Sequence, residues 1–189
     1  MTSPGSVRGD ERLRLFLALR LPARVLDALE TWQGRSFRPA GADGVRVVPR
    51  DHLHLTLAFL GSRPAVELDA IVGELRAAAT SAPADLRLAP SRYRETRSVA
   101  MLVLDDVGGG ATAFATDLGH RLEALGVYEL EERPWLPHVT VGRFRTRPRL
   151  RLEPPPLGTF VPSDAAAFLS RLRPGGAQYV ALESIALGG

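Results

Sequence analysis

Two short stretches share one pattern, and together they restrict the fold more than any other feature of the sequence. They read His54-Leu55-Thr56-Leu57 and His138-Val139-Thr140-Val141. Polar and apolar residues alternate in both stretches, which is typical of a half-buried β-strand. Because successive side chains of a strand point to opposite faces, the histidine and threonine share one face and the aliphatic residues pack behind them. We therefore expect two strands that each present an imidazole beside a hydroxyl.

The two motifs are separated by nearly half of the 189 residues, and each has helix and strand patterns around it. An internal duplication of about half the chain would relate the two motif strands by a pseudo-twofold axis. Alternation of strands and helices without a clear linker predicts an α+β fold. We expect two pseudo-symmetric lobes, each an antiparallel-rich sheet with helices outside, and His-x-Thr-x strands that face a central cleft.

Hydrophobic periodicity assigns most other segments to strands or helices. Strand patterns cover residues 15–19, 45–48, 86–88 and 99–104, and helix patterns cover residues 22–34, 65–80 and 114–125, the last with Gly126 as its C-cap. A Pro/Gly loop is expected over residues 37–44. Pro174-Gly175-Gly176 separates two apolar stretches and indicates a hairpin. We expect a disordered N-terminus over residues 1–9 and a single domain over residues 10–189.

The composition excludes several classes of chemistry. The chain has no cysteine, which rules out disulfides, a thiolate metal site and a cysteine nucleophile. All 24 basic residues are arginine, which rules out a Walker-type phosphate site, a Schiff base and a lysine that carries a nucleotide. The apolar run Leu15–Leu19 is too short for a signal peptide or a membrane span. We expect a cytoplasmic protein, and its net charge of +3 is compatible with nucleic acid.

The sequence around both motifs resembles the two-histidine (2H) phosphoesterase superfamily, and most closely its LigT-like branch of RNA 2′,3′-cyclic phosphodiesterases. The segments that carry the resemblance are an opening strand, the two motifs and a closing hairpin, at residues 15–19, 48–61, 137–143 and 168–187. It spans nearly the whole chain. Two departures are His52, where an uncharged polar residue is more usual, and residues 92–97, which match poorly.

The resemblance implies hydrolysis of an RNA 2′,3′-cyclic phosphate end to a 2′-phosphate, with no metal and no cofactor. One histidine deprotonates water and the other protonates the departing ribose oxygen, so His54 and His138 are the expected catalytic residues. Histidine suits both roles because its pKa lies near the working pH. Thr56, Thr140 and Arg143 are the expected substrate-binding residues, because they can stabilise the charge that develops on the phosphate oxygens.

We further hypothesise that His54 is the general acid and His138 the general base. Arg143 lies five residues after His138 and would face away from it on a regular strand. A bend near Gly142 would bring the guanidinium to the phosphate, where its charge would lower the pKa of His138 and favour the neutral form.

Other interpretations of the site stay open. His52 and His54 form a possible metal half-site, although no third ligand is apparent nearby. Within enzymes, the substrate could be a small cyclic phosphate, or the protein could join 2′–5′ RNA ends in reverse. From another class, it could be an RNA-binding module without turnover, although binding alone would not need two imidazoles. We expect an RNA or oligonucleotide partner, no membrane partner and a monomer, and we assign no role to His120.

Arginine occupies every second position from Arg143 to Arg151. If this run is extended, its five guanidinium groups share one face and form a track for RNA phosphates, with Phe144 available for stacking. The equally strong alternative is a solvated edge whose charges discourage aggregation. A second basic patch is possible at Arg92, Arg94 and Arg97, with Tyr93 among them.

Overall fold

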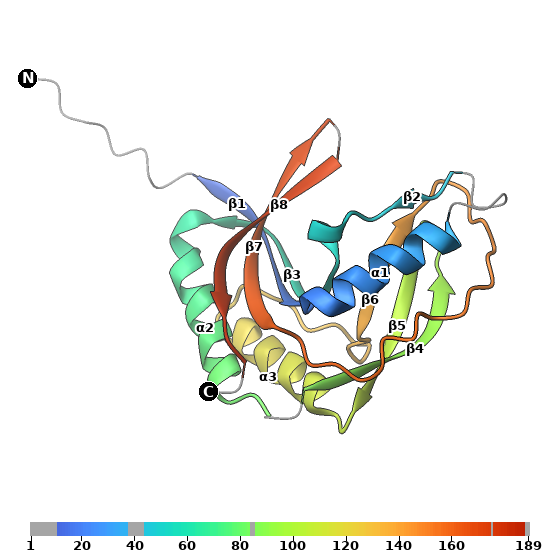
Figure 1. Cartoon of the computed structure of the whole chain (residues 1–189). Coiled ribbons are helices and arrows are strands. Elements are labelled where there is room, and N and C mark those ends of the chain that lie inside the picture. The colour runs from blue at the N-terminus through green and yellow to red at the C-terminus, as the bar shows by residue number, and fades with distance from the viewer. Residues whose placement is uncertain (1–10, 38–43, 84–85, 175, 188–189) are drawn as a thin grey trace, which may run out of the picture.

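The structure, a computed structural model, describes residues 11–37, 44–83, 86–174 and 176–187. The expected disordered N-terminus and most of the expected loop at residues 37–44 lie outside these ranges. Strands and helices are arranged as two sheets side by side (Figure 1). Within the described residues, the fold is α+β with two four-stranded antiparallel sheets and three α-helices, which confirms the predicted class.

Each sheet has a simple strand order. The first sheet runs β3 (His54–Pro64), β1 (Arg12–Arg20), β7 (Asp164–Arg173) and β8 (Gly176–Ile185). The second sheet runs β2 (Arg46–Val47), β6 (His138–Arg143), β5 (Val99–Val107) and β4 (Arg87–Glu95). The first sheet therefore combines strands from both ends of the chain, so the two sheets do not correspond to its two halves.

Strand β1 lies inside the first sheet and is buried on both faces, which explains its continuous apolar sequence. Leu15, Leu17 and Leu19 point into the main core, which also contains buried residues of the second sheet and all three helices. Phe16 and Ala18 point to the opposite face, where they form a smaller cluster with alanine and phenylalanine side chains of β7.

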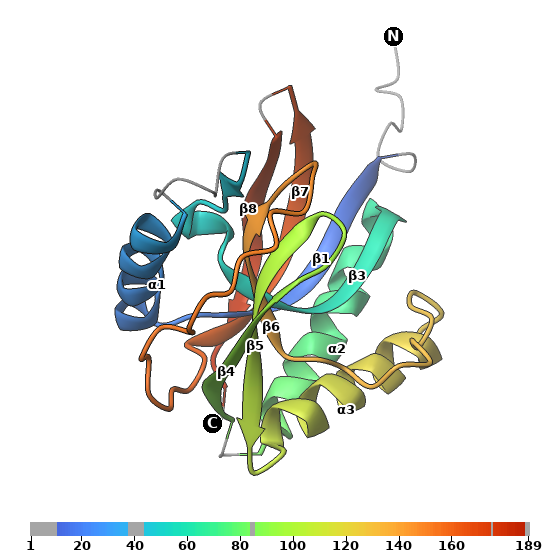
Figure 2. The same cartoon turned by 90° about the vertical axis from the view of Figure 1, so that its right-hand side faces the viewer.

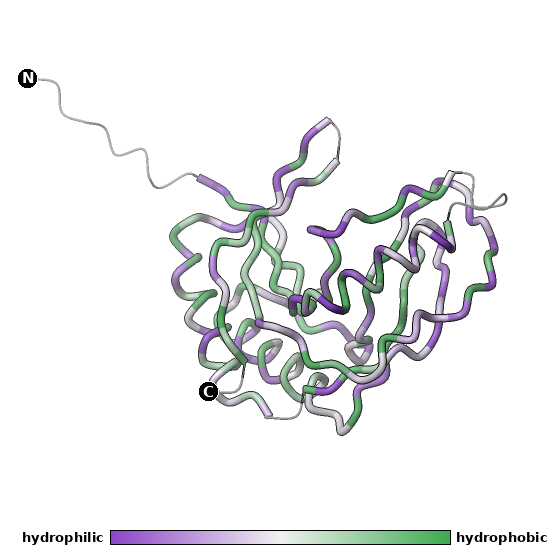
Figure 3. Tube along the Cα trace, in the orientation of Figure 1, coloured by the Kyte–Doolittle hydropathy of each residue, from purple (hydrophilic) through white to green (hydrophobic). Residues whose placement is uncertain are grey.

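The helices cover the outside of the sheets (Figure 2). They are α1 (Ala23–Ser36), α2 (Leu68–Thr80) and α3 (Gly110–Ala124). Helix α1 is tied to the second sheet by the buried amide of Gln33, whose Nε2 donates to the carbonyls of Val48 at 3.0 Å and Val141 at 2.8 Å. Helix α2 packs on β7 and β8, and α3 contacts α2 and both sheets. Figure 3 shows hydrophobic residues concentrated in the strands and on these helices.

The element boundaries mostly agree with the sequence patterns. The glycine C-cap of α3 is confirmed, because Gly126 has φ 75° and the amide of Val127 donates to the carbonyl of Leu122 at 3.1 Å. The hairpin is also confirmed as β7 and β8. Helix α1 continues two residues past Gly34, its expected end. Among the described residues, none of the helices has the length and apolarity needed to cross a membrane.

Candidate active site

The two motif strands come from different sheets and contact each other, β3 from the first and β6 from the second. The residues singled out from the sequence all line one pocket of about 580 Å³, namely His54, Thr56, His138, Thr140 and Arg143. Both imidazoles and both hydroxyls are therefore brought to the same cavity from positions that are far apart in the chain.

A β-bulge follows each threonine and changes which face the next residues occupy. In β3 the pairing with β1 shifts between Thr56 and Ala58, and in β6 the pairing with β5 shifts between Thr140 and Gly142. The fifth residue after each histidine consequently turns back toward the pocket. The expected bend near Gly142 is therefore present.

Gly142 fits this bend because the inner side of the bulge is crowded. A Cβ atom at this position would lie 3.0 Å from Cγ1 of Val45 and 3.4 Å from Cβ of Ala100. Arg143 lines the pocket from β6, and Phe59 lines it from the matching position of β3. The Phe59 side chain is 65% exposed. Sequence reasoning missed Phe59, and the available signal was its spacing from His54, which equals the spacing of Arg143 from His138.

His54 lies on an aromatic surface of the first sheet. Its ring centroid is 5.0 Å from that of Phe16, 6.1 Å from that of Phe168 and 5.7 Å from that of Tyr179. The pKa of His54 is lowered from 6.5 to about 4, mainly by burial and to a smaller extent by the charges of His52, His138 and Arg143. A hydrogen bond with the His52 backbone opposes this shift. The ring of His54 is therefore neutral at pH 7 in the free protein.

His138 is oriented by the main chain. Its Nδ1 lies 2.8 Å from the carbonyl oxygen of Leu136. Because a carbonyl only accepts, Nδ1 carries the hydrogen and Nε2 is left for a substrate. His54 has the corresponding interaction with the backbone of His52. Each imidazole is thus held by the residue two positions before it, and this fixes the ring relative to its strand.

His52 is not on the motif strand. It ends the 3-10 turn η1 (Arg50–His52), and its ring centroid lies 4.3 Å from that of Tyr179. His52 nevertheless lines the same pocket as His54, and both rings contact Tyr179. Among the described residues, no group of three or more His, Asp or Glu side chains is arranged to hold a metal ion.

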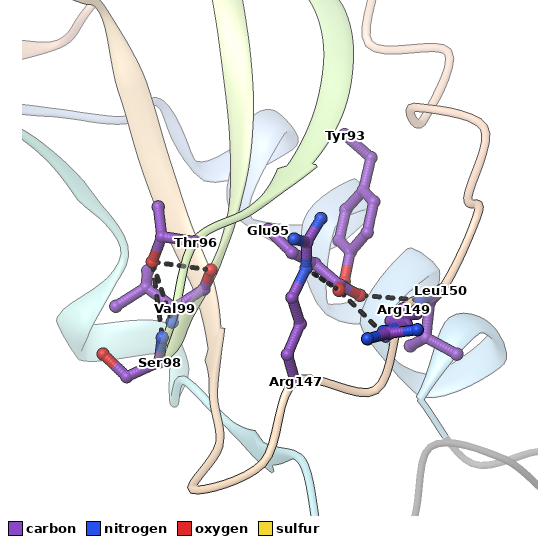
Figure 4. A network of polar contacts seen from close by, with 8 residues as sticks. All are labelled: Tyr93, Glu95, Thr96, Ser98, Val99, Arg147, Arg149 and Leu150. Carbon is purple, nitrogen blue, oxygen red and sulfur yellow. Dashed lines mark hydrogen bonds and ion pairs between the residues drawn. The ribbon is translucent and has the colours of Figure 1, made fainter.

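The arginine run after β6 does not form an extended track. Strand β6 ends at Arg143, Phe144 is buried, and Arg149 has a positive φ of 59°. The chain instead folds around the carboxylate of Glu95, whose side chain is only 2% exposed (Figure 4). The condition for a shared face, an extended run, is therefore not met, and the segment instead forms hydrogen bonds with the buried carboxylate of Glu95.

Four donors surround that carboxylate. Oε1 accepts from the hydroxyl of Tyr93 at 2.9 Å and the amide of Leu150 at 2.8 Å. Oε2 accepts from the amide of Arg149 at 2.9 Å and from Nε of Arg147 at 3.1 Å. Burial, together with the hydrogen bond to Glu95, raises the pKa of Tyr93. Tyr93 therefore belongs to this network and does not extend the basic patch predicted around it.

The chain was compared with known proteins. Residues 19–90 match the family described as LigT like Phosphoesterase. The RNA 2′,3′-cyclic phosphodiesterase of Thermus thermophilus is 35% identical over 193 residues, covering 94% of this chain and 91% of the relative. The Escherichia coli protein of the same name is 30% identical over 148 residues, covering 70% and 73%.

Solved structures agree with these matches. The crystal structure of E. coli LigT complexed with 3′-AMP has a TM-score of 0.80 and 25% sequence identity, and the match covers 95% of this chain and all of that chain. Both the sequence similarity and the fold therefore extend over most of the molecule. The chain belongs to the family of LigT-like phosphoesterases.

Proposed function

We propose that this protein hydrolyses the 2′,3′-cyclic phosphate at the end of an RNA or oligonucleotide and leaves a 2′-phosphate, without a metal ion. The observation that carries the proposal is the single pocket that two imidazoles, two hydroxyls and a guanidinium line together. The names of the relatives in Thermus thermophilus and E. coli support the substrate class.

The reaction needs two proton transfers. A base removes a proton from water as its oxygen attacks phosphorus, and an acid donates a proton to the ribose 3′-oxygen as its bond to phosphorus breaks. Each transfer typically contributes a factor of ~10²–10⁴ to the rate. The two imidazoles serve these roles, while Thr56, Thr140 and Arg143 stabilise the charge on the remaining phosphate oxygens.

We assign the general base to His54 and the general acid to His138, the reverse of the hypothesis drawn from the sequence. That hypothesis placed the lowered pKa on His138, whereas burial lowers the pKa of His54 to about 4. A neutral ring accepts a proton from water. Burial makes protonation of the His54 ring costly, so we give the acid role to the other imidazole of the pocket, His138.

The two matching bulge positions make the pocket asymmetric. Arg143 offers a cation from β6, and Phe59 offers an exposed ring from β3. The guanidinium suits the phosphate, and the phenyl ring suits the apolar face of the nucleoside. This asymmetry favours a nucleoside phosphate over inorganic phosphate alone.

The proposal is tested with a short synthetic RNA that carries a 2′,3′-cyclic phosphate. Wild-type protein in excess EDTA should convert it to a 2′-phosphate, identified by ³¹P NMR. His54→Gln and His138→Gln should each reduce kcat/KM by ~10²-fold or more, with thermal unfolding as the control for folding. A 3′-phosphate product, or full activity in both variants, would reject the proposed reaction.

A substrate with a p-nitrophenolate leaving group separates the two roles. This group leaves without a proton, so the general acid becomes dispensable. His138→Ala should recover much of its lost rate on the activated phosphodiester, while His54→Ala should stay inactive. Recovery by His54→Ala alone would restore the assignment drawn from the sequence.

A further inference from the structure

Two arginines stand opposite each other at the rim of the pocket that holds the two histidines. Arg46 of β2 is the cross-strand partner of Arg143 of β6 in an antiparallel pair. Directly paired residues lie on the same face of a sheet, with their Cβ atoms about 5 Å apart. Both arginines are exposed and both line the pocket. The pairing therefore places two positive charges side by side, an arrangement that destabilises a sheet.

The fold keeps this pair in register. The amide of Val48 donates to the carbonyl oxygen of Val141 at 3.1 Å, and the buried side chain of Gln33 donates to the carbonyls of both residues. The guanidinium of Arg46 also lies beside the hairpin of β7 and β8, since a Cβ atom at Gly176 would lie 3.7 Å from its Nη1. The backbone positions of the two arginines are therefore fixed relative to each other, although their charges repel.

Within the part of the chain that the structure describes, no carboxylate balances these two charges. Neither Arg46 nor Arg143 takes part in an ion pair there, whereas several other arginines do. The basic side chains that line the pocket are these two arginines and His52, His54 and His138, and none of the described aspartates and glutamates lines it. A concave site lined by one sign of charge attracts ligands of the opposite sign, so the pair of arginines indicates a site for anions.

We propose that Arg46 binds a second phosphate of the substrate, the phosphodiester that joins the terminal nucleoside to the nucleotide before it. This inference rests on the proposed function. The cyclic phosphate carries one negative charge and Arg143 serves it, so the guanidinium of Arg46 is left for another anion. In an RNA strand, the phosphate on the 5′ side of the terminal ribose is the next anion along the chain. Arg46 thereby makes the enzyme favour RNA ends over mononucleoside cyclic phosphates.

The test removes one charge from the substrate and one from the protein. Two dinucleotides that end in a 2′,3′-cyclic phosphate are compared, one with the natural phosphodiester between its nucleosides and one with an uncharged methylphosphonate there. They share both nucleosides, so a contact with a base affects them alike. Arg46→Gln removes the proposed partner of the phosphodiester. The matched control is Arg145→Gln, which removes an exposed guanidinium that does not line the pocket.

Wild type and Arg145→Gln should hydrolyse the phosphodiester form with a kcat/KM about tenfold or more above that of the methylphosphonate form, the scale of a hydrogen bond to a charged group. Arg46→Gln should bring this ratio close to one. Each ratio is taken within one variant, so a loss of folded protein cancels. A ratio near one in wild type would overturn the proposal. Equal loss by Arg46→Gln on both dinucleotides would do so too, because Arg46 would then support the cyclic phosphate or the fold.

A free 5′-phosphate on a mononucleotide offers the same chemistry from another source. The third substrate is therefore a nucleoside 2′,3′-cyclic phosphate that carries a 5′-phosphate. If Arg46→Gln lowered kcat/KM for this substrate but left the ratio of the two dinucleotides unchanged, the site would take a small nucleotide and the assignment to RNA would fail.

A binding measurement keeps this test separate from the proposed reaction. Calorimetry uses the same two dinucleotides with a 2′-phosphate in place of the cyclic phosphate. Wild type should bind the phosphodiester form about tenfold or more tightly than the methylphosphonate form, and Arg46→Gln should bind both alike. If wild type hydrolyses none of the cyclic substrates, the proposed function fails while this comparison still decides the second phosphate site. Equal affinity of wild type for both ligands would reject the site even in an active enzyme.

Discussion

The lowered pKa of His54 predicts a specific dependence of stability on pH. The folded protein holds this imidazole neutral down to a pKa of about 4, whereas the unfolded chain protonates it near 6.5. Between these values the unfolded state binds more protons, so the free energy of unfolding falls as the pH falls. The full interval between the two pKa values corresponds to roughly 3 kcal/mol.

His54→Gln removes this titration and keeps a polar side chain at the same place. Urea unfolding should be measured at pH 7 and pH 4.5, in a buffer without phosphate because that anion can bind the site. Between these pH values the wild type should lose roughly 2 to 3 kcal/mol more stability than His54→Gln. The comparison of slopes cancels the carboxylates, which titrate in both proteins.

The control is His120→Gln, which removes an exposed imidazole of α3 and should leave the wild-type curve unchanged. Parallel curves for wild type and His54→Gln over this interval would refute the reasoning, because they would mean that folding does not oppose protonation of the buried ring. The assignment of His54 as the base would then lose its physical support.

Three further predictions follow from the same structure. Glu95→Ala should lower the free energy of unfolding, measured in urea, by roughly 3–5 kcal/mol because it leaves buried donors unpaired. Arg147→Gln keeps three of the four donors and should lower the free energy of unfolding clearly less. Equal losses in the two variants would contradict the network. Gly142→Val should affect kcat/KM more strongly than it affects thermal unfolding, because a side chain there moves the bulge that turns Arg143 to the pocket. Unchanged kcat/KM in a normally folded variant would count against that geometry. Cyclic-phosphate hydrolysis should survive excess EDTA and follow a bell-shaped pH profile of kcat/KM, whereas loss on chelation that zinc restores would favour a metal mechanism.

The two bulges explain how a duplicated motif forms an asymmetric site. Each strand presents a histidine and a threonine by simple alternation, and each bulge then brings one more side chain to the same pocket. The residue delivered is a phenylalanine in β3 and an arginine in β6. The histidines and threonines, for which we propose roles in proton transfer and charge stabilisation, are therefore matched, while Phe59 and Arg143 make the two strands differ.

The sequence alone determined the features that depend on local order. The period-2 alternation predicted that His54 and Thr56 share one face, and the Pro-Gly-Gly stretch predicted the hairpin of β7 and β8. These features can be predicted from the sequence because the geometry of a strand and the residues of a turn depend only on a few neighbouring positions. The apolar pattern likewise predicted a strand over residues 15–19, which lies within β1.

Only the tertiary structure decided the features that depend on distant partners. The arginine run has strand-like spacing, yet it is not a strand. Its chain turns at Glu95, which lies 54 residues before Arg149 and accepts hydrogen bonds from the amides of Arg149 and Leu150. The pKa of His54 is set largely by burial on a surface built from β1, β7 and β8, and no local pattern encodes that desolvation. Burial determines both the path of the arginine segment and the protonation state of His54. A polar group that is removed from water must be stabilised by hydrogen bonds or stay uncharged, and its partners come from distant parts of the chain.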